Sequence, residues 1–158
     1  MSLGSESKQG DHMDRYDRLI LRELQQDARL SFSEIGRRVS LSQPTVAERV
    51  RRMEEVGIIR GYHVDVDPKK IGLALTAFIR LKIPHPTPRQ KKLEQLIETE
   101  LVEIRESHRV TGDHSLFLKA EVGSMAELDE LLNKLSAYGQ SYTSIVLTTT
   151  FERQNCRV

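Results

Sequence analysis

The sequence has no tryptophan, a single cysteine and no long hydrophobic run. The single cysteine, Cys156, excludes an internal disulfide framework and is typical of proteins in a reducing compartment. No apolar stretch approaches the ~20 residues that a membrane-spanning helix requires, and no signal-peptide pattern opens the chain. These absences predict a cytoplasmic protein that has no membrane partner.

Net charge is also nearly absent, at +1 from 24 basic and 23 acidic residues in a chain of 158. The apolar fraction of 38% is enough for one ordinary domain or two small ones. The balance hides a local excess, because six arginines lie close together in the N-terminal half: Arg37, Arg38, Arg49, Arg51, Arg52 and Arg60. A local basic face of this kind is a feature of nucleic-acid-binding proteins.

The N-terminal third predicts three short helices. Asp14 suits the N-cap of the first helix, Ser31 with Glu34 forms a capping-box pattern for the second, and Ser42 can cap the third. Gly57 is placed to end the third helix. A short helix joined by a tight turn to a second, arginine-rich helix is typical of DNA-reading helix-turn-helix units.

The third helix of this unit divides into an apolar face and a polar face. Val46, Val50 and Met53 recur at helical spacing and are predicted to face the core. The side chains predicted to reach base edges are Gln43, Thr45, Glu48 and Arg49, and Ser42 at the cap is predicted to bind DNA beside them. The side chains predicted to contact phosphates are Arg38, Arg51 and Arg52.

A simpler interpretation of the same arginines is a solvated helix face on which they pair with Glu48, Glu54 and Glu55. For an isolated helix this interpretation would be preferred. In the capped three-helix context, DNA binding is favoured.

An extended segment follows the helices. Residues 61–66 alternate in the manner of a short strand, which predicts a winged helix-turn-helix unit over residues 13–62 and a linker strand over residues 63–72. Residues 1–12 are polar and aperiodic, so they are predicted to form a disordered arm or a remnant of cloning outside the fold.

The second half, residues 73–153, alternates between strand and helix patterns. The predicted elements are a strand at 75–83, a helix containing Leu93, Leu96 and Ile97, strands at 104–111 and 115–122, a helix capped by Ser124, and a strand at 143–151. This βαββαβ order predicts a ferredoxin-like domain, and the chain as a whole is predicted to be α+β.

Ordered motifs across both halves carry a family resemblance. They are Leu30-Ser31 with Glu34-Ile35, Leu41-Ser42, Val46 with Arg49-Val50 and Met53-Glu54, Gly57-Ile58-Ile59 with Gly61-Tyr62, and Val110-Thr111-Gly112-Asp113. From Met13 to Phe151 the chain resembles the Lrp/AsnC, or feast/famine, family of prokaryotic transcriptional regulators. The resemblance implies a winged-helix DNA reader and a ligand-sensing ferredoxin-like domain that dimerises and assembles further, into tetramers or octamers.

The resemblance also implies an effector site. In this family the turn between the second and third strands of the sensor helps to build a small-molecule pocket at a subunit interface. The residues at that turn here are Thr111, Gly112, Asp113 and His114. Glycine permits close backbone approach, and Asp113 can accept the α-ammonium group of an amino acid. The structural alternative is a plain hairpin turn without a ligand.

Two positions depart from the family pattern. Family members that bind amino acids often have a second acidic residue where this chain has Ser115, which keeps open a different effector or none. Ser40 replaces the usual glycine of the helix-turn-helix turn, so we expect a slightly strained left-handed residue there.

The sequence therefore predicts a sequence-specific DNA-binding transcriptional regulator that an amino acid modulates. Apolar residues on the uncovered sheet face are expected to support a homodimer, and they are Phe78, Phe117, Val146 and Thr148. The alternative function is an architectural protein that bridges DNA without an effector. The histidines are scattered and no nucleophile or metal-ligand spacing is present, so no catalytic residue, metal or cofactor is expected. A nucleoid-associated location follows from DNA binding.

Overall fold

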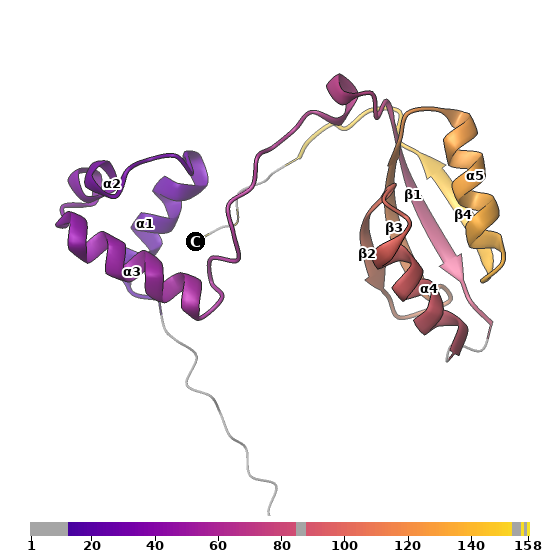
Figure 1. The fold of residues 1–158 in the computed structure, drawn as a ribbon, viewed down its shortest axis with the longest axis horizontal. Coiled ribbons are helices and arrows are strands. Elements are labelled where there is room, and N and C mark those ends of the chain that lie inside the picture. Colours follow the sequence, from indigo (N-terminus) through magenta and orange to yellow (C-terminus); the bar gives the residue numbers. More distant parts are fainter. Residues whose placement is uncertain (1–12, 85–87, 153–155, 157) are drawn as a thin grey trace, which may run out of the picture. The chain divides into compact units, whose positions relative to one another are not determined.

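The computed structural model describes residues 13–84, 88–152, 156 and 158 (Figure 1). Contacts divide the chain into two compact units. One holds the described residues up to Val64 together with those from Glu152 onward, and the other runs from Asp65 to Phe151. The arm predicted over residues 1–12 lies outside the described residues.

The N-terminal unit consists of three helices, α1 (Arg15–Gln26), α2 (Phe32–Val39) and α3 (Gln43–Glu55). The predicted caps are confirmed, since the side chains of Asp14, Ser31 and Ser42 each accept a backbone N–H at the start of the helix that follows. A full capping box forms only at α1, where the Asp14 N–H donates to the carboxylate of Asp17 at 3.0 Å. The box predicted at Ser31 is half formed, because the Glu34 carboxylate instead accepts from two arginines of α2.

The three helices share one core. Its buried side chains are Ile20, Leu21, Leu24, Ile35, Val39, Val46, Val50 and Met53. This set includes Val46, Val50 and Met53, which confirms the apolar face predicted for the third helix. Val158 also packs against this core, and its backbone oxygen accepts from the Arg22 guanidinium at 2.8 Å. This contact explains why the described residues from Glu152 onward group with the N-terminal unit.

The turn between α2 and α3 is close-packed. Ser40 has φ 59° and ψ 44°, so it adopts the left-handed conformation that the sequence predicts. Gly36 faces the same turn, where a Cβ atom would lie 2.5 Å from the backbone oxygen of Leu41. The turn therefore needs a residue without a side chain at position 36 and a left-handed residue at position 40.

The wing predicted after α3 is not formed. Gly57, with φ +75°, follows the end of α3, but residues 61–67 have no regular secondary structure. A 3₁₀ helix, Pro68–Ile71, stands where part of the linker strand was predicted. The prediction was wrong because alternation alone does not make a strand, which requires a neighbour for its backbone groups. Within the described residues no strand of this chain pairs with this segment.

The second unit has the predicted order of strands and helices. Its elements are β1 (Leu75–Lys82), α4 (Pro88–Thr99), β2 (Ile104–Arg109), β3 (Leu116–Val122), α5 (Met125–Ser136) and β4 (Gln140–Ile145). The strands form one sheet in the order β2-β3-β1-β4 with antiparallel neighbours (Figure 1). This arrangement is the ferredoxin-like sheet that the sequence predicts.

Only one face of this sheet is covered. Alternate side chains such as Ile79 and Leu118 pack with α4 and α5 in a second hydrophobic core. On the opposite face Phe78, Phe117 and Tyr142 are 45%, 37% and 40% exposed. We call these three aromatic residues the open-face aromatics.

The last strand is shifted from its predicted position. It covers residues 140–145 rather than 143–151, because β1 determines where β4 can pair. Ala77, near the start of β1, is opposite Ile145 at the end of β4. Beyond this pair, the Val146 N–H donates one more hydrogen bond, to the Thr76 carbonyl. Thr148 therefore lies beyond the sheet, and Tyr142 is the aromatic residue of β4 that shares the open face with Phe78 and Phe117.

None of the helices in the described part of the chain is long and apolar enough to cross a membrane.

The left-handed Ser40 yields a prediction about stability. Ser40→Gly should raise the free energy of unfolding of the N-terminal unit by about 1 kcal/mol, because glycine adopts this conformation without a Cβ clash. Urea denaturation followed by circular dichroism measures the change. Ser40→Ala is the control, since it keeps the strain and should give no gain. A Ser40→Gly protein no more stable than wild type would show that the serine conformation costs nothing.

Candidate nucleic-acid interface and effector turn

The helix α3 presents two different faces. Val46, Val50 and Met53 are 0–1% exposed, so the inner face is fully used by the core. Of the eight residues predicted to bind DNA, seven are exposed and Arg49 is half-buried. The outer face is therefore available to a partner, as the spacing predicts.

The N-terminal turn of α3 is organised by its cap. The Ser42 hydroxyl accepts the backbone N–H of Thr45 at 3.3 Å and lies 2.7 Å from the Thr45 hydroxyl. Gln43 occupies the first helical position and is exposed. This turn thus places one amide and two hydroxyl groups at the surface, each able to donate and accept hydrogen bonds.

Farther along the outer face, the carboxylate of Glu48 accepts from the guanidinium of Arg51 at 2.5 Å, and Arg51 also pairs with Glu55. These hydrogen bonds raise the pKa of Arg51 and lower that of Glu48. On this part of α3 the arginine therefore pairs with glutamates at the surface, as the simpler interpretation of the sequence expects. Exposed pairs of this kind are weak, so they do not prevent either side chain from meeting a ligand.

Arg49 and Arg52 are held differently. The Asp17 carboxylate, which is 0% exposed, accepts from Arg49 Nη1 at 2.8 Å through Oδ1 and from Arg52 Nη2 at 2.7 Å through Oδ2. Arg49 also donates to Asp14 at 2.6 Å, and its guanidinium lies 5.6 Å from the ring centre of Tyr16. We call these four charged side chains the α1–α3 ion network: Asp14, Asp17, Arg49 and Arg52.

The ion network shifts the pKa values of two of its members, Arg49 and Asp14. Hydrogen bonds to Asp17 and then to Asp14 raise the pKa of Arg49. The backbone N–H of Asp17, followed by the Arg49 guanidinium, lowers the pKa of Asp14. Both groups are therefore firmly ionised at neutral pH, and Arg49 is directed toward α1 and not outward from α3.

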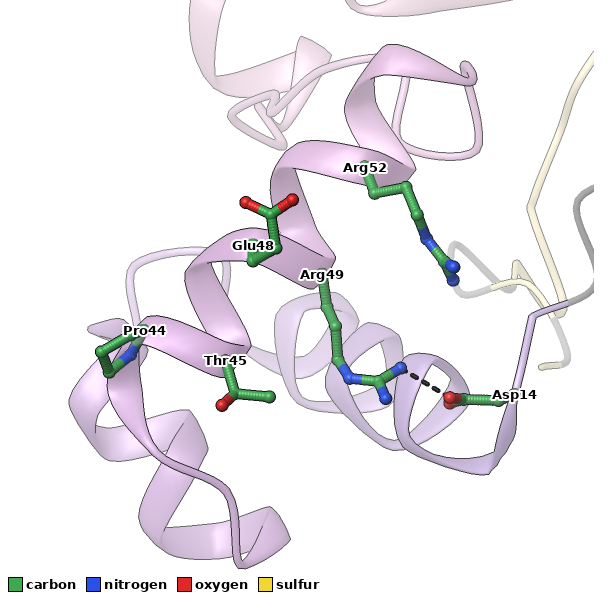
Figure 2. A pocket seen from close by; sticks show the side chains of 6 residues that line it. All are labelled: Asp14, Pro44, Thr45, Glu48, Arg49 and Arg52. Atoms are coloured by element: carbon green, nitrogen blue, oxygen red, sulfur yellow. Dashed lines mark hydrogen bonds and ion pairs between the residues drawn. The ribbon is translucent and has the colours of Figure 1, made fainter.

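An open hollow lies beside the ion network. Figure 2 shows the side chains that line it, which are Asp14, Pro44, Thr45, Glu48, Arg49 and Arg52. In this view Arg49 reaches toward Asp14 while Glu48 points away from Asp14. Three of the four members of the ion network thus lie beside two of the predicted base readers, Thr45 and Glu48.

Arg38 belongs to α2 and has its own partners. Its guanidinium donates to Glu23 at 2.8 Å and to Glu34 at 3.1 Å, and these bonds raise its pKa. The side chain remains 42% exposed. It is therefore accessible at the surface of the helix-turn-helix unit.

The predicted effector residues lie in the connection between β2 and β3 but do not all point together. Thr111, Gly112 and Asp113 are exposed, and Gly112 has φ +101°. His114 instead packs edge-on against Phe117 and Tyr142, with ring centres 6.3 and 5.3 Å away. The turn therefore offers three residues at its tip, while His114 joins the open-face aromatics.

Ser115 has a structural role at the same turn. Its hydroxyl accepts the backbone N–H of Ile83 at 3.1 Å, and its own N–H donates to the Leu81 carbonyl at 2.8 Å. Both bonds tie the turn to the end of β1. The Ser115 hydroxyl is thus engaged with the backbone.

The histidines beside the turn do not converge on a shared ligand. The His108 ring lies 3.3 Å from the carboxylate of Glu106, whereas His114 contacts aromatic rings. Among the residues that the structure describes, no group of three or more His, Cys, Asp or Glu side chains is arranged to hold a metal ion.

Sequence reasoning missed the partners of the predicted DNA-binding arginines. It treated Asp14 only as a cap and did not consider Asp17. The available signal was their spacing of three residues at the start of a helix, which matches the capping-box positions. The approach of this helix start to α3 depends on tertiary packing, which the sequence pattern does not specify.

The burial of Asp17 leads to a prediction. Asp17→Asn should lower the free energy of unfolding of the N-terminal unit by about 2–3 kcal/mol, because a buried partner of two guanidinium groups loses its charge. Chemical denaturation measures the loss. The matched control is Asp27→Asn at the C-cap of α1, which removes an exposed charge that accepts the Arg29 backbone N–H. Equal effects of the two substitutions would contradict a structural role for the Asp17 charge.

Comparison with known proteins agrees with this architecture. The AsnC-type helix-turn-helix domain matches residues 13–54, and the Lrp/AsnC ligand binding domain matches residues 76–156. The chain is 34% identical over 136 residues to the HTH-type transcriptional regulator LrpC of Bacillus subtilis, covering 86% of this chain and 92% of that protein. It is 35% identical over 147 residues to the leucine-responsive regulatory protein of Escherichia coli, covering 90% of each chain.

Solved structures show the same fold. Bacillus subtilis LrpC superposes with a TM-score of 0.83 at 32% identity, over 90% of this chain and 99% of the other. A transcriptional regulator from Neisseria meningitidis in complex with L-Met superposes with a TM-score of 0.86 at 24% identity, over 92% and 97% of the two chains. The matched domains, their order and the near-complete coverage agree, and this protein belongs to the Lrp/AsnC family of transcriptional regulators.

Proposed function

We propose that this regulator binds double-stranded DNA by placing the N-terminal half of α3 in the major groove. The division of α3 supports this proposal, because its inner side chains are buried in the core while its first turns expose polar groups. Helix-turn-helix proteins bring this part of the second helix to base edges. The side chains in position to read bases are Gln43, Thr45 and Glu48, with Ser42 at the cap.

The arginines supply contacts with the DNA backbone. Arg38 and Arg51 are exposed and carry only weak surface pairs, so they suit phosphate contacts. For Arg49 we propose a phosphate contact and not the base contact expected from sequence, because Asp17 holds its guanidinium against α1. Arg52, held by the same carboxylate, has the same role.

Gln43 and Arg38 should respond differently to substitution. Gln43→Ala should weaken binding to a duplex that the protein selects from a random pool by about 1–3 kcal/mol, and binding to a mixed-sequence duplex much less. Arg38→Ala should weaken both equally and reduce the slope of log affinity against log salt by about 0.9. Fluorescence anisotropy at several salt concentrations measures both quantities.

The contrast between the two variants tests the assignment. Equal losses on both duplexes for Gln43→Ala would remove Gln43 from the base readers. Failure of the wild-type protein to bind either duplex would contradict the DNA interface as a whole.

We further propose that the regulator acts as a homodimer that assembles into tetramers or octamers. The open-face aromatics support this, because three large rings on an otherwise uncovered sheet form a surface that water solvates poorly. A two-fold dimer also presents two copies of α3 to a pseudo-palindromic site. Binding to the chromosome assigns the protein to the cytoplasm, in association with the nucleoid.

We propose an amino acid as the effector, bound at the tip formed by Thr111, Gly112 and Asp113, with His114 beside it. Asp113 is exposed and has no ion pair or side-chain hydrogen bond within the described part of the chain, so its carboxylate is available for an α-ammonium group. The L-Met complex of the Neisseria meningitidis protein supports this class of ligand. The tip is exposed in a single chain, so a second subunit is needed to enclose the ligand.

The effector proposal predicts a loss of response on substitution. The wild-type protein should melt at a higher temperature with at least one standard amino acid, in a concentration-dependent way. Asp113→Ala should abolish that shift while leaving DNA binding of the free protein unchanged. Asp129→Ala on α5 is the matched control and should keep the shift. A normal response of Asp113→Ala would move the site elsewhere, and silence across all amino acids would favour the architectural DNA-bridging function.

A further inference from the structure

The two carboxylates that hold Arg49 differ in accessibility. Asp17 is 0% exposed, and each of its oxygens accepts from a guanidinium group. Asp14 is 47% exposed, lies at the edge of the hollow beside α3, and is bound to Arg49 by only one of its oxygens. Asp17 is thus a permanent partner of Arg49, whereas Asp14 is a partner that another anion can replace.

The two oxygens of Asp14 also have separate partners. Oδ1 accepts the backbone N–H groups of Tyr16 and Asp17 at 2.7 and 2.9 Å, which caps α1. Oδ2 accepts from Arg49 at 2.6 Å. The cap can therefore persist when the bond to Arg49 is broken, so release of Arg49 does not require α1 to unwind.

The hollow gives an external anion access to this point. Thr45 lines it with a hydroxyl donor, and Arg52 lines it with a second guanidinium that is 44% exposed. Glu48 also lines the hollow, and its carboxylate forms an exposed pair with Arg51. The other polar groups that α3 presents to the hollow are the Thr45 hydroxyl and the guanidinium groups of Arg49 and Arg52. All three can donate hydrogen bonds to a phosphate oxygen.

We propose that Asp14 is an internal counter-anion that occupies the place of a DNA phosphate on Arg49 in the free protein. This proposal rests on the DNA interface described above. When DNA binds, a backbone phosphate displaces Oδ2 of Asp14 from Arg49, while Asp17 keeps the guanidinium in position. Because the exchange involves the backbone only, Asp14 lowers affinity for all DNA sequences equally.

The variant Asp14→Asn isolates this role. Asparagine caps helices as well as aspartate does, so Oδ1 can still accept its two backbone N–H groups. The charge facing Arg49 is lost. Affinity for both the selected and the mixed-sequence duplex should rise by up to about fivefold, the range that exposed ion pairs span. The salt slope should steepen by up to about 0.9, the value for one additional phosphate contact.

Two controls separate this effect from a general change in charge. Asp27→Asn removes the same charge at the other end of α1 and should give a smaller rise with an unchanged slope. In an Arg49→Ala background, Asp14→Asn should do no more than Asp27→Asn. Urea denaturation of Asp14→Asn checks that the unit remains folded.

The outcomes are distinct. A rise in affinity with a steeper slope, lost in the Arg49→Ala background, supports the counter-anion. The proposal is overturned, with the DNA interface left intact, if Asp14→Asn raises DNA affinity no more than Asp27→Asn does. It is also overturned if Asp14→Asn raises affinity as much in the Arg49→Ala background as in the wild-type protein. A wild-type protein that binds neither duplex overturns the interface and this proposal with it.

Discussion

The buried carboxylate of Asp17 fixes how α3 is presented. A charge without exposure to water is tolerated only when its hydrogen bonds are complete, and here two guanidinium groups and the Asp14 backbone N–H complete them. The three helices share only a small apolar core. Apolar contacts hold the helices together but do not fix how α3 is rotated about its own axis. Directional bonds from α3 to the start of α1 add the missing constraint. The same bonds direct the guanidinium groups of Arg49 and Arg52 toward α1, which is why we propose shorter polar side chains as the base readers.

Both units keep one surface that their own core does not use. In the N-terminal unit this surface is the polar outer side of α3, and in the second unit it is the open sheet face with its aromatic residues. The first suits a nucleic acid and the second suits another copy of the chain. The turn that carries Asp113 ends on the strand that bears Phe117, and His114 packs on that ring. If subunits meet through the open sheet face, as we propose, a ligand at this turn would lie beside that interface and could alter assembly.

Much of the fold could be predicted from local patterns. The caps at Asp14, Ser31 and Ser42, the left-handed Ser40 and the βαββαβ order depend on residues close in sequence, and the structure confirms them. The failures depend on pairing between distant segments: the predicted wing has no neighbouring strand, and β4 ends where β1 ceases to pair. The candidate site was limited in the same way. Spacing identified the outer face of α3 but could not reveal that Asp17, 32 residues before Arg49, holds its guanidinium.

The central claim, that Asp17 and Arg49 act together to fix α3, is tested most directly by a double-mutant cycle. The free energy of unfolding would be measured by urea denaturation for wild type, Asp17→Ala, Arg49→Ala and the double variant. Because the two side chains share a part-buried hydrogen bond, we expect the double variant to be less destabilised than the sum of the single variants by at least about 1 kcal/mol. Additivity within about 0.5 kcal/mol would contradict the claim, because it would mean that the pair contributes no coupling.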